Sequence, residues 1–263
     1  DFTNNDPEYI SQFKAAFSKT FPDCRLHVFK RKPQGFTKKA YQSLEIHSKH
    51  VLEFLTNLGL TPARAGQKEV PHIIFNSSKK SLSAFIRGYA EGDGSVYLSG
   101  APEISLISKS RSLLSQLQLL LLRFGIESSN RYQPSKKIYK LLVRGNTNLN
   151  RFLNQINFAS NRKIQFLAKI SKMNADGWAM AKTDYVPFLS DYLRNSGKYK
   201  GHINWLKKHN LDRYPKLKRL QPQLSKILDQ EDKELVNDLL KREFLFDKVI
   251  KIADAGNERV FSL

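Results

Sequence analysis

The sequence has only one cysteine, Cys24, among its 263 residues. A disulfide within the chain and a zinc site built from several thiolates are therefore excluded. This scarcity is typical of a protein in a reducing compartment, so we expect a cytoplasmic, intracellular location. The sequence also lacks an apolar run approaching the about 20 residues that a membrane-spanning helix needs. We therefore expect no membrane-spanning helix in this sequence and no membrane as a partner.

Acidic residues are few compared with basic ones. The chain has 24 Asp and Glu against 44 Lys and Arg, which gives a formal net charge of +20. Such a surplus favours a polyanionic partner, and double-stranded DNA is the leading candidate. An anionic membrane surface is the alternative, but the positive charges are not gathered on one amphipathic helix.

The chain starts without an initiator methionine and without a signal peptide. Its opening residues, DFTNNDPEYI, are polar and lead directly into a helical pattern. We therefore expect the sequence to be an internal or processed piece of a longer protein.

An internal repeat with a period near 100 residues is the most informative pattern. Residues 2–60 and 106–158 each contain a strand end, a helix, two strands and a helix, and their closing phrases FLTNLGL and FLNQINF align. A period of this length indicates a duplicated subdomain; a chance likeness between two amphipathic α/β stretches is the alternative. The helix and strand predicted at 81–108 have no partner in the first copy, so we expect that partner upstream of Asp1.

The helix predicted from residue 81 carries two unusual features. Ala84, Gly88 and Gly92 recur at intervals of four, and such a stripe lets another helix approach closely. The helix then ends on two acids, Glu91 and Asp93, although a helix C-terminus is the less favourable end for negative charge. If a twin helix brought a second set of acids alongside, a hard divalent cation with oxygen ligands would relieve their repulsion.

These residues resemble a known family. IRGYAEGDG, residues 86–94, resembles the dodecapeptide of LAGLIDADG homing endonucleases. KEVPHIIF, residues 68–75, resembles the block that precedes the second dodecapeptide in intein-borne members. FDKVIKIADAGNERVFSL, residues 246–263, resembles the strand that re-enters the splicing domain of an intein.

The resemblance implies an α/β (α+β) fold with a pseudo-symmetric core and a small, mostly helical accessory domain. Each half of the core is αββαββα, with a saddle-shaped antiparallel sheet that lies over DNA. We expect the remainder of the first half at 1–80, the second half at 81–172, an accessory basic region at 173–245, and the start of a splicing segment at 246–263. The first dodecapeptide and the residues needed for splicing are not in the sequence, so we expect neither splicing nor a complete two-acid site from these residues alone.

The implied function is site-specific double-strand cleavage of DNA with Mg²⁺ (or Mn²⁺), by an enzyme that is a monomer when complete. Its other partners would be the exteins of a host protein. Two alternatives remain: a DNA-binding protein on the same scaffold that does not cleave, and an inactive endonuclease domain of an intein.

By position in the motif, the resemblance assigns Asp93 as the catalytic metal ligand and gives Glu91 a structural or capping role. The alternative for Asp93 is a polar helix cap. Lys68 and its repeat mate Lys163 are the candidates for stabilising charge at the scissile phosphate, with Arg162 as the rival of Lys163. The small residues Ala84, Gly88 and Gly92 would form the helix interface.

Basic residues in the predicted strand pairs and in the accessory region are candidates for DNA contacts, chiefly with phosphates. The alternative for such runs is a solvated face, and a helix-turn-helix in the accessory region is one possibility for its structure. The candidates are Lys30, Arg31, Lys32, Lys38, Lys39, Arg131, Lys136, Lys137, Lys140, Arg144, Lys207 and Lys208.

Overall fold

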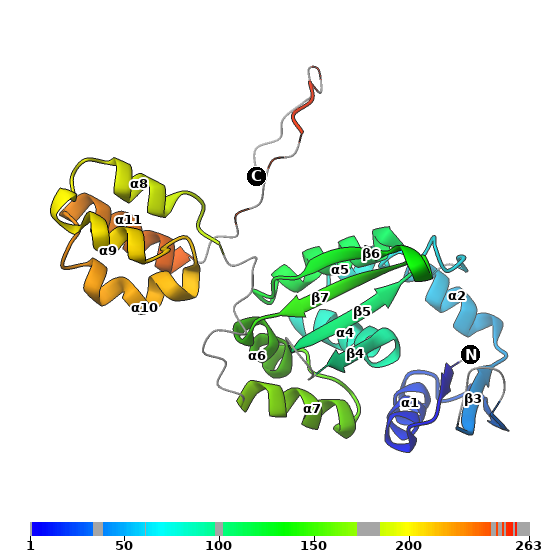
Figure 1. Ribbon diagram of the computed structural model, residues 1–263. Coiled ribbons are helices and arrows are strands. Elements are labelled where there is room, and N and C mark those ends of the chain that lie inside the picture. Colours follow the sequence, from blue (N-terminus) through cyan, green and yellow to red (C-terminus); the bar gives the residue numbers. More distant parts are fainter. Residues whose placement is uncertain are drawn as a thin grey trace. The chain divides into compact units, whose positions relative to one another are not determined.

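The computed structural model describes residues 2–33, 39–60, 62–97, 102–172 and 185–242, together with 246, 249, 251–254 and 256. The chain divides into two compact units, Asp1–Thr183 and Asp184–Leu263 (Figure 1). The first unit combines helices with two antiparallel sheets, and the second contains helices and, among its described residues, no sheet. The expected α/β (α+β) class is confirmed.

The first unit begins with a three-stranded antiparallel sheet in the order β1-β3-β2. Its strands are β1 (Phe2–Asn4), β2 (Leu26–Arg31) and β3 (Tyr41–Ile46), and its helices are α1 (Pro7–Thr20) and α2 (Lys49–Asn57).

The rest of the first unit contains a four-stranded antiparallel sheet in the order β4-β5-β7-β6. Its strands are β4 (Gly94–Tyr97), β5 (Glu103–Ser108), β6 (Ser129–Gln133) and β7 (Ile138–Arg144). A 3-10 turn, Pro134–Lys136, joins β6 to β7. The helices are α3 (His72–Phe75), α4 (Lys79–Asp93), α5 (Arg111–Leu122), α6 (Asn146–Gln155) and α7 (Asn161–Lys172).

The two sheets repeat one topology. The order β1-β3-β2 corresponds to β5-β7-β6, with an acid or serine cap, Asp6 or Ser110, at the start of the helix that follows the first strand of each set. These side-chain oxygens accept bonds from free amides at the helix start, which fixes where each helix begins. The predicted repeat of elements is confirmed. Within the described residues, α4 and β4 have no counterpart in the first copy.

The second copy has much the larger core. Helices α4, α5 and α6 and strands β5 and β7 bury a continuous apolar cluster that includes Ile86, Leu106, Leu117, Leu141 and Phe152. In the first copy, by contrast, the buried apolar residues are Ile10, Phe17, Leu44 and Val51, while Val28, Phe29, Leu52, Phe54 and Leu60 are exposed.

The second unit is a small helical cluster. Its apolar core includes Leu193, Leu206, Leu217 and Val236. Its helices are α8 (Leu189–Asn195), α9 (Ile203–Lys208), α10 (Tyr214–Leu224) and α11 (Gln230–Arg242), with a 3-10 turn at Lys200–His202. In the predicted C-terminal strand, the described residues 246, 249, 251–254 and 256 are not in a strand, and the remainder lies outside the described residues.

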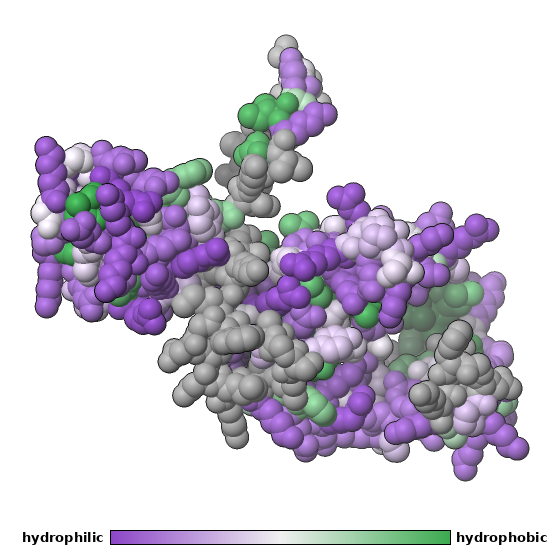
Figure 2. Space-filling model, viewed as in Figure 1, coloured by the Kyte–Doolittle hydropathy of each residue, from purple (hydrophilic) through white to green (hydrophobic). Residues whose placement is uncertain are grey.

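Polar residues dominate the surface in view on each unit (Figure 2). Of the helices that the structure describes, none has both the length and the apolar composition needed to cross a membrane.

Helix α4 passes into β4 without a loop, and Gly94 makes this junction possible. A Cβ at this position would lie against the Ala90 carbonyl oxygen and 2.9 Å from Leu106 Cδ2, whereas a Cβ at Gly92 would meet nothing within 4 Å. We expect Gly94→Ala to lower the free energy of unfolding by about 1–3 kcal/mol because the backbone must shift. Gly92→Ala should raise it by up to about 1 kcal/mol through helix propensity.

Urea unfolding of both variants, followed by circular dichroism, measures these changes. Equal losses in the two variants would contradict the role assigned to Gly94.

Candidate active site and nucleic-acid interface

Asp93 is the last residue of α4 and is exposed. Ala84, Gly88 and Gly92, which precede it on the same helix, are exposed as well. A Cβ at Gly88 or Gly92 would have no neighbour within 4 Å. Among the described residues, the side of α4 that carries Ala84, Gly88 and Gly92 is therefore open to a partner.

The electrostatic surroundings of Asp93 include both predicted lysines. Partial burial raises the pKa of the Asp93 carboxyl above its ordinary value, and the positive charges of Lys68 and Lys163 oppose this rise. The structure thus brings Lys68, which is exposed, and Lys163, on α7, into electrostatic range of the acid at the end of α4.

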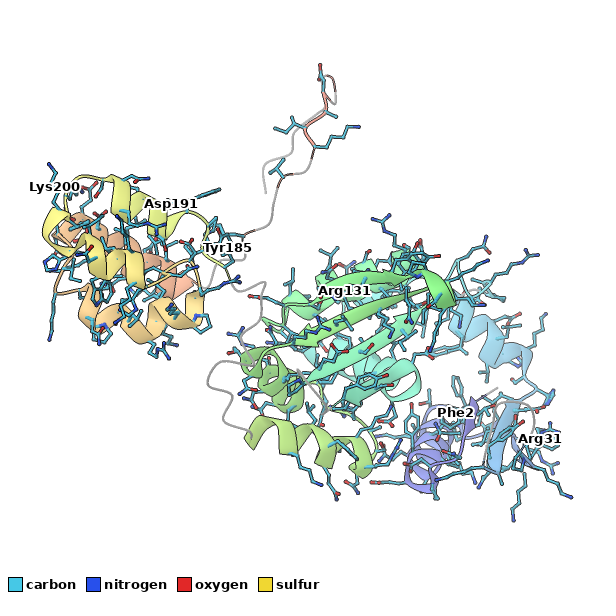
Figure 3. All side chains as sticks on the ribbon, in the orientation of Figure 1. Phe2, Arg31, Arg131, Tyr185, Asp191 and Lys200 are labelled. Atoms are coloured by element: carbon cyan, nitrogen blue, oxygen red, sulfur yellow. The ribbon has the colours of Figure 1, made fainter. Side chains whose placement is uncertain are left out.

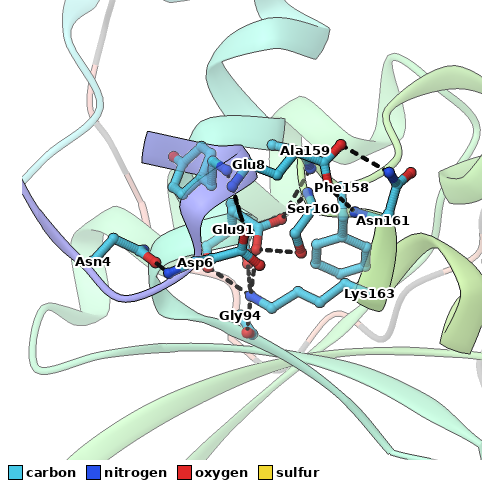
Figure 4. Close-up of polar contacts among 12 residues, drawn as sticks. Asn4, Asp6, Glu8, Glu91, Gly94, Phe158, Ala159, Ser160, Asn161 and Lys163 are labelled. Carbon is cyan, nitrogen blue, oxygen red and sulfur yellow. Dashed lines mark hydrogen bonds and ion pairs between the residues drawn. The ribbon is translucent and has the colours of Figure 1, made fainter. Parts of the chain in front are cut away.

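Glu91 is buried and fully engaged. Its Oε2 accepts hydrogen bonds from the backbone amides of Ala159 (2.9 Å) and Ser160 (3.0 Å), and its Oε1 accepts one from Ser160 Oγ (2.8 Å) (Figure 4). These amides lie immediately before α7, where free N–H groups and the helix dipole favour an anion. An acid that ends one helix therefore caps the start of another.

Lys163 caps the end of α4 in return. Its Nζ donates to the carbonyl oxygens of Ala90 (3.2 Å), Glu91 (2.5 Å) and Gly94 (2.8 Å), and lies 3.4 Å from Glu91 Oε1. Burial lowers the pKa of Lys163, whereas the negative charges of Glu91 and Asp93 oppose this shift.

Residues at the start of α7 also form hydrogen bonds with helix α1 in the first copy of the repeat. Asn161 donates through its backbone amide (3.2 Å) and its Nδ2 (2.8 Å) to the carboxylate of Glu8, and Gln12 Nε2 donates to the Ala159 carbonyl (3.0 Å). Sequence analysis did not identify Glu8, Gln12, Ser160 or Asn161. The bonded partners are far apart in the sequence, so no local pattern indicates these contacts. The one local signal was the pair Ser160-Asn161, which precedes a helical pattern and could have marked the start of α7.

A polar pocket of about 400 Å³ opens between the two copies beside these contacts. Arg162, which is exposed, lines it together with Lys163. The remaining lining residues are Asn4, Asn5, Asp6, Glu91, Gly92, Gly94, Ser95, Val96 and Phe166.

The donor groups near Asp93 decide how a metal could be held. Within the part of the chain that the structure describes, no three His, Cys, Asp or Glu side chains are grouped as a metal site. Glu91 is occupied by its three donors, so Asp93 is the acid of α4 that remains available. Mg²⁺ commonly binds one or two carboxylates and completes its shell with water and substrate phosphate oxygens, and Asp93 fits that mode.

The strand register shows on which face of the larger sheet each basic residue lies. Leu106 and Leu141 are Cα partners and are fully buried, so they face the helices. Because side chains alternate along a strand, Arg131, Lys140 and Arg144 share the opposite face, where Arg131 is exposed and Lys140 and Arg144 are half-buried. We refer to this side as the open face. Arg144 is bonded to Glu103 across this face, whereas Lys136 and Lys137 lie in the turn between β6 and β7.

In the smaller sheet, the strand register places two candidates for DNA contacts, Lys30 and Arg31, on different faces. Val28 pairs with the buried Leu44, so Lys30 lies on the helix-facing side and Arg31 on the open side. Lys30 and Arg31 therefore point to opposite faces of the sheet, since side chains alternate along a strand. Their contacts with DNA stay a prediction. The Arg31 guanidinium pairs with the Glu45 carboxylate, with 3.2 Å between Nη2 and Oε1. Figure 3 shows Arg31 on the smaller sheet and Arg131 on the larger one. Lys32 and Lys39 are exposed and outside the strands; Lys38 lies outside the described residues.

In the second unit, Lys207 and Lys208 are exposed at the end of α9. Partial burial, and then the positive charges of Lys216, Lys208 and Arg219, lower the pKa of His209. Elsewhere in the unit, the buried Asp232 carboxylate accepts hydrogen bonds from Tyr192, Tyr199 and Lys198.

Curated proteins with different names are similar to the chain, among them a DNA gyrase and a replication factor. The DNA gyrase A protein of Mycobacterium gordonae is 27% identical over 269 residues, covering 100% of this chain and 47% of that protein. The replication factor C small subunit of Methanocaldococcus jannaschii is 29% identical over 175 residues, covering 65% of this chain and 9% of that protein. The chain thus spans about half the length of the gyrase protein and a small part of the replication factor.

Among solved structures, the homing endonuclease I-DmoI in complex with DNA and Mn is similar with a TM-score of 0.45 and 16% identity. The match covers 59% of this chain and 78% of that one. The family model described as LAGLIDADG-like domain matches residues 80–157. The matched residues run from α4 to α6 and make up less than half of the chain.

Proposed function

We propose that this chain is part of an intein-borne homing endonuclease that cleaves both strands of a specific DNA site by metal-assisted phosphodiester hydrolysis. The observation that carries the proposal is the end of α4 in the residues that match the LAGLIDADG-like domain model. There, an available acid, Asp93, follows an unpartnered small-residue face and lies within electrostatic range of Lys68 and Lys163.

In this site Asp93 would hold Mg²⁺ (or Mn²⁺), which when bound supplies an activated water and stabilises charge at the phosphate. Lys68 is exposed near Asp93, so its ammonium can approach a scissile phosphate and stabilise the charge that develops there. Of the two rivals on α7, we favour Arg162 for a second such contact, because the Lys163 ammonium is already bound to three carbonyl oxygens.

The open face of the larger sheet is the proposed DNA-reading surface. Arg131 and Lys140 are cross-strand neighbours on it and can reach a groove, while Lys136 and Lys137 in the adjoining turn suit phosphate contacts. Arg31 has the corresponding open position in the smaller sheet. The cationic cluster around His209, together with Lys207 and Lys208, is a proposed second contact to DNA from the accessory region.

The intein context is supported by the two curated relatives. A DNA gyrase and a replication factor have different tasks, yet each contains a stretch similar to this chain. A mobile element inserted into different host proteins explains this pattern. We propose intracellular exteins as the flanking partners, with 1–80, 81–172, 173–245 and 246–263 as the segments of the inserted protein.

Two open features indicate what completes the core. Strand β5 pairs with both β4 and β7, whereas its counterpart β1 pairs with β3 alone in the described sheet. The small-residue side of α4 is also open. A second helix–strand segment of the α4–β4 type would add a strand to β1 and pack its helix against α4, which gives a monomer with two acids at adjoining helix ends.

The test compares residues 1–263 with an extended protein that carries such a helix–strand segment ahead of β1. We expect a melting temperature higher by at least several degrees, because the segment buries the open face and edge. We also expect specific plasmid cleavage with Mg²⁺ from the extended protein and none from residues 1–263.

Specific cutting by residues 1–263 as a monomer would contradict this assignment, because the second acid would then come from within them. DNA binding without cutting by the extended protein would favour the alternative function of a non-cleaving DNA-binding protein.

A further inference from the structure

The contacts of Lys163 lie on both sides of Asp93 in the chain. Its ammonium donates to the carbonyls of Ala90 and Glu91 before Asp93 and to the carbonyl of Gly94 after it. Carbonyls at the end of a helix lack intrahelical partners, so a cation there both satisfies them and interacts favourably with the helix dipole. One side chain thereby holds the backbone on either side of the acid.

Lys163 is itself held in place. Its side chain is 13% exposed and that of Glu91 is 5% exposed, and the Glu91 carboxylate is fixed to the amides that precede α7. The ammonium also lies 5.3 Å from the centroid of the Phe158 ring. The acid of α4 thus caps α7, and the lysine of α7 caps α4. We refer to Glu91, Ser160 and Lys163 together as the α4–α7 clasp.

We propose that the α4–α7 clasp positions Asp93, and that Glu91 and Lys163 act on the site through this acid rather than by touching metal or DNA. The inference rests on the proposed function for the role of Asp93, but the clasp has consequences that can be measured without DNA or cleavage. It explains why two acids end α4: one anchors the helix end and leaves the other available.

Hydrogen exchange of the full chain tests the clasp directly. Lys163→Met keeps the length and apolar stem of the side chain and removes its three donors. We expect the backbone amides of residues 91–95 to exchange at least about tenfold faster, because the last turn of α4 opens more often. Arg162→Met removes the same charge from the neighbouring position and should leave these amides unchanged.

The affinity for Mn²⁺ in the absence of DNA gives a second readout, because loss of charge and loss of positioning are expected to change this affinity in opposite directions. Loss of a nearby positive charge alone would strengthen cation binding at Asp93, so Arg162→Met should bind Mn²⁺ at least as tightly as the parent. If positioning dominates, Lys163→Met should bind it more weakly despite the same change in charge. Unchanged exchange together with equal or tighter Mn²⁺ binding in Lys163→Met would overturn the proposal.

A milder variant keeps the test valid if Lys163→Met does not fold. Ser160→Ala removes one of the three donors to Glu91 and should accelerate exchange of the amides of residues 159 and 160; unchanged exchange in this variant would also overturn the clasp. Faster exchange in the variants, together with no Mn²⁺ binding by the extended protein that carries the second acid, would overturn Asp93 as a ligand and with it the proposed function, while the clasp would stand.

Discussion

Asp93→Asn in the extended protein is expected to reduce the rate of plasmid cleavage by at least about 100-fold, while DNA binding changes by no more than a few fold. Asparagine keeps the size and most of the hydrogen-bonding capacity of the side chain but lacks the negative charge that holds a hard divalent cation. Partial burial raises the pKa of the Asp93 carboxyl, and the positive charges of Lys68 and Lys163 oppose this rise. Cleavage rates and gel-shift affinities measured side by side separate the two effects.

The control is Asp23→Asn, which changes an exposed acid in the turn after α1. Its cleavage rate should equal that of the parent. Cleavage by Asp93→Asn at a rate near the parental one would make Asp93 a polar helix cap, and the metal site would have to lie elsewhere.

The affinity of the chain for duplex DNA is expected to fall steeply with salt. A protein with a net charge of +20 that neutralises several phosphates releases their counterions, and each phosphate contributes about −0.9 to the slope of log K against log salt concentration. Six phosphate contacts would weaken binding about 1000-fold between 50 and 200 mM salt. Fluorescence anisotropy with a labelled duplex measures the slope.

Single substitutions locate the phosphate contacts. Lys136→Ala, in the turn beside the open face, should make the slope shallower by about 0.9. Lys49→Ala, on α2 and paired with Glu53, should leave it unchanged. A slope near zero for the parent protein would remove DNA from the proposed function.

The secondary structure could be predicted because its signals are local. Asp6, Ser48, Ser78 and Ser110 each accept a hydrogen bond from an amide in the first turn of the helix that follows, and apolar spacing sets the helix faces. The order of elements was likewise readable from the repeat, and the sheets β1-β3-β2 and β5-β7-β6 reproduce it.

Strand register was beyond the reach of the sequence pattern. Lys30 and Arg31 are adjacent and equally basic, and only the pairing of Val28 with the buried Leu44 shows which of them lies on the helix-facing side. A shift of one residue would exchange the two, since side chains alternate along a strand.

The sequence by itself determined the repeated order of elements and the acidic end of α4, because caps, periodicity and a short motif act over a few residues. The C-terminal strand that it also predicted is not formed by the described residues there. Only the tertiary structure decided what those acids and lysines do. Glu91 accepts a hydrogen bond from Ser160, 69 positions away, and Lys163 reaches the carbonyls of Ala90 and Glu91 in α4 from 73 and 72 positions away. Packing of α7 against the end of α4 creates these contacts, and no local pattern encodes which of two acids is held and which stays available.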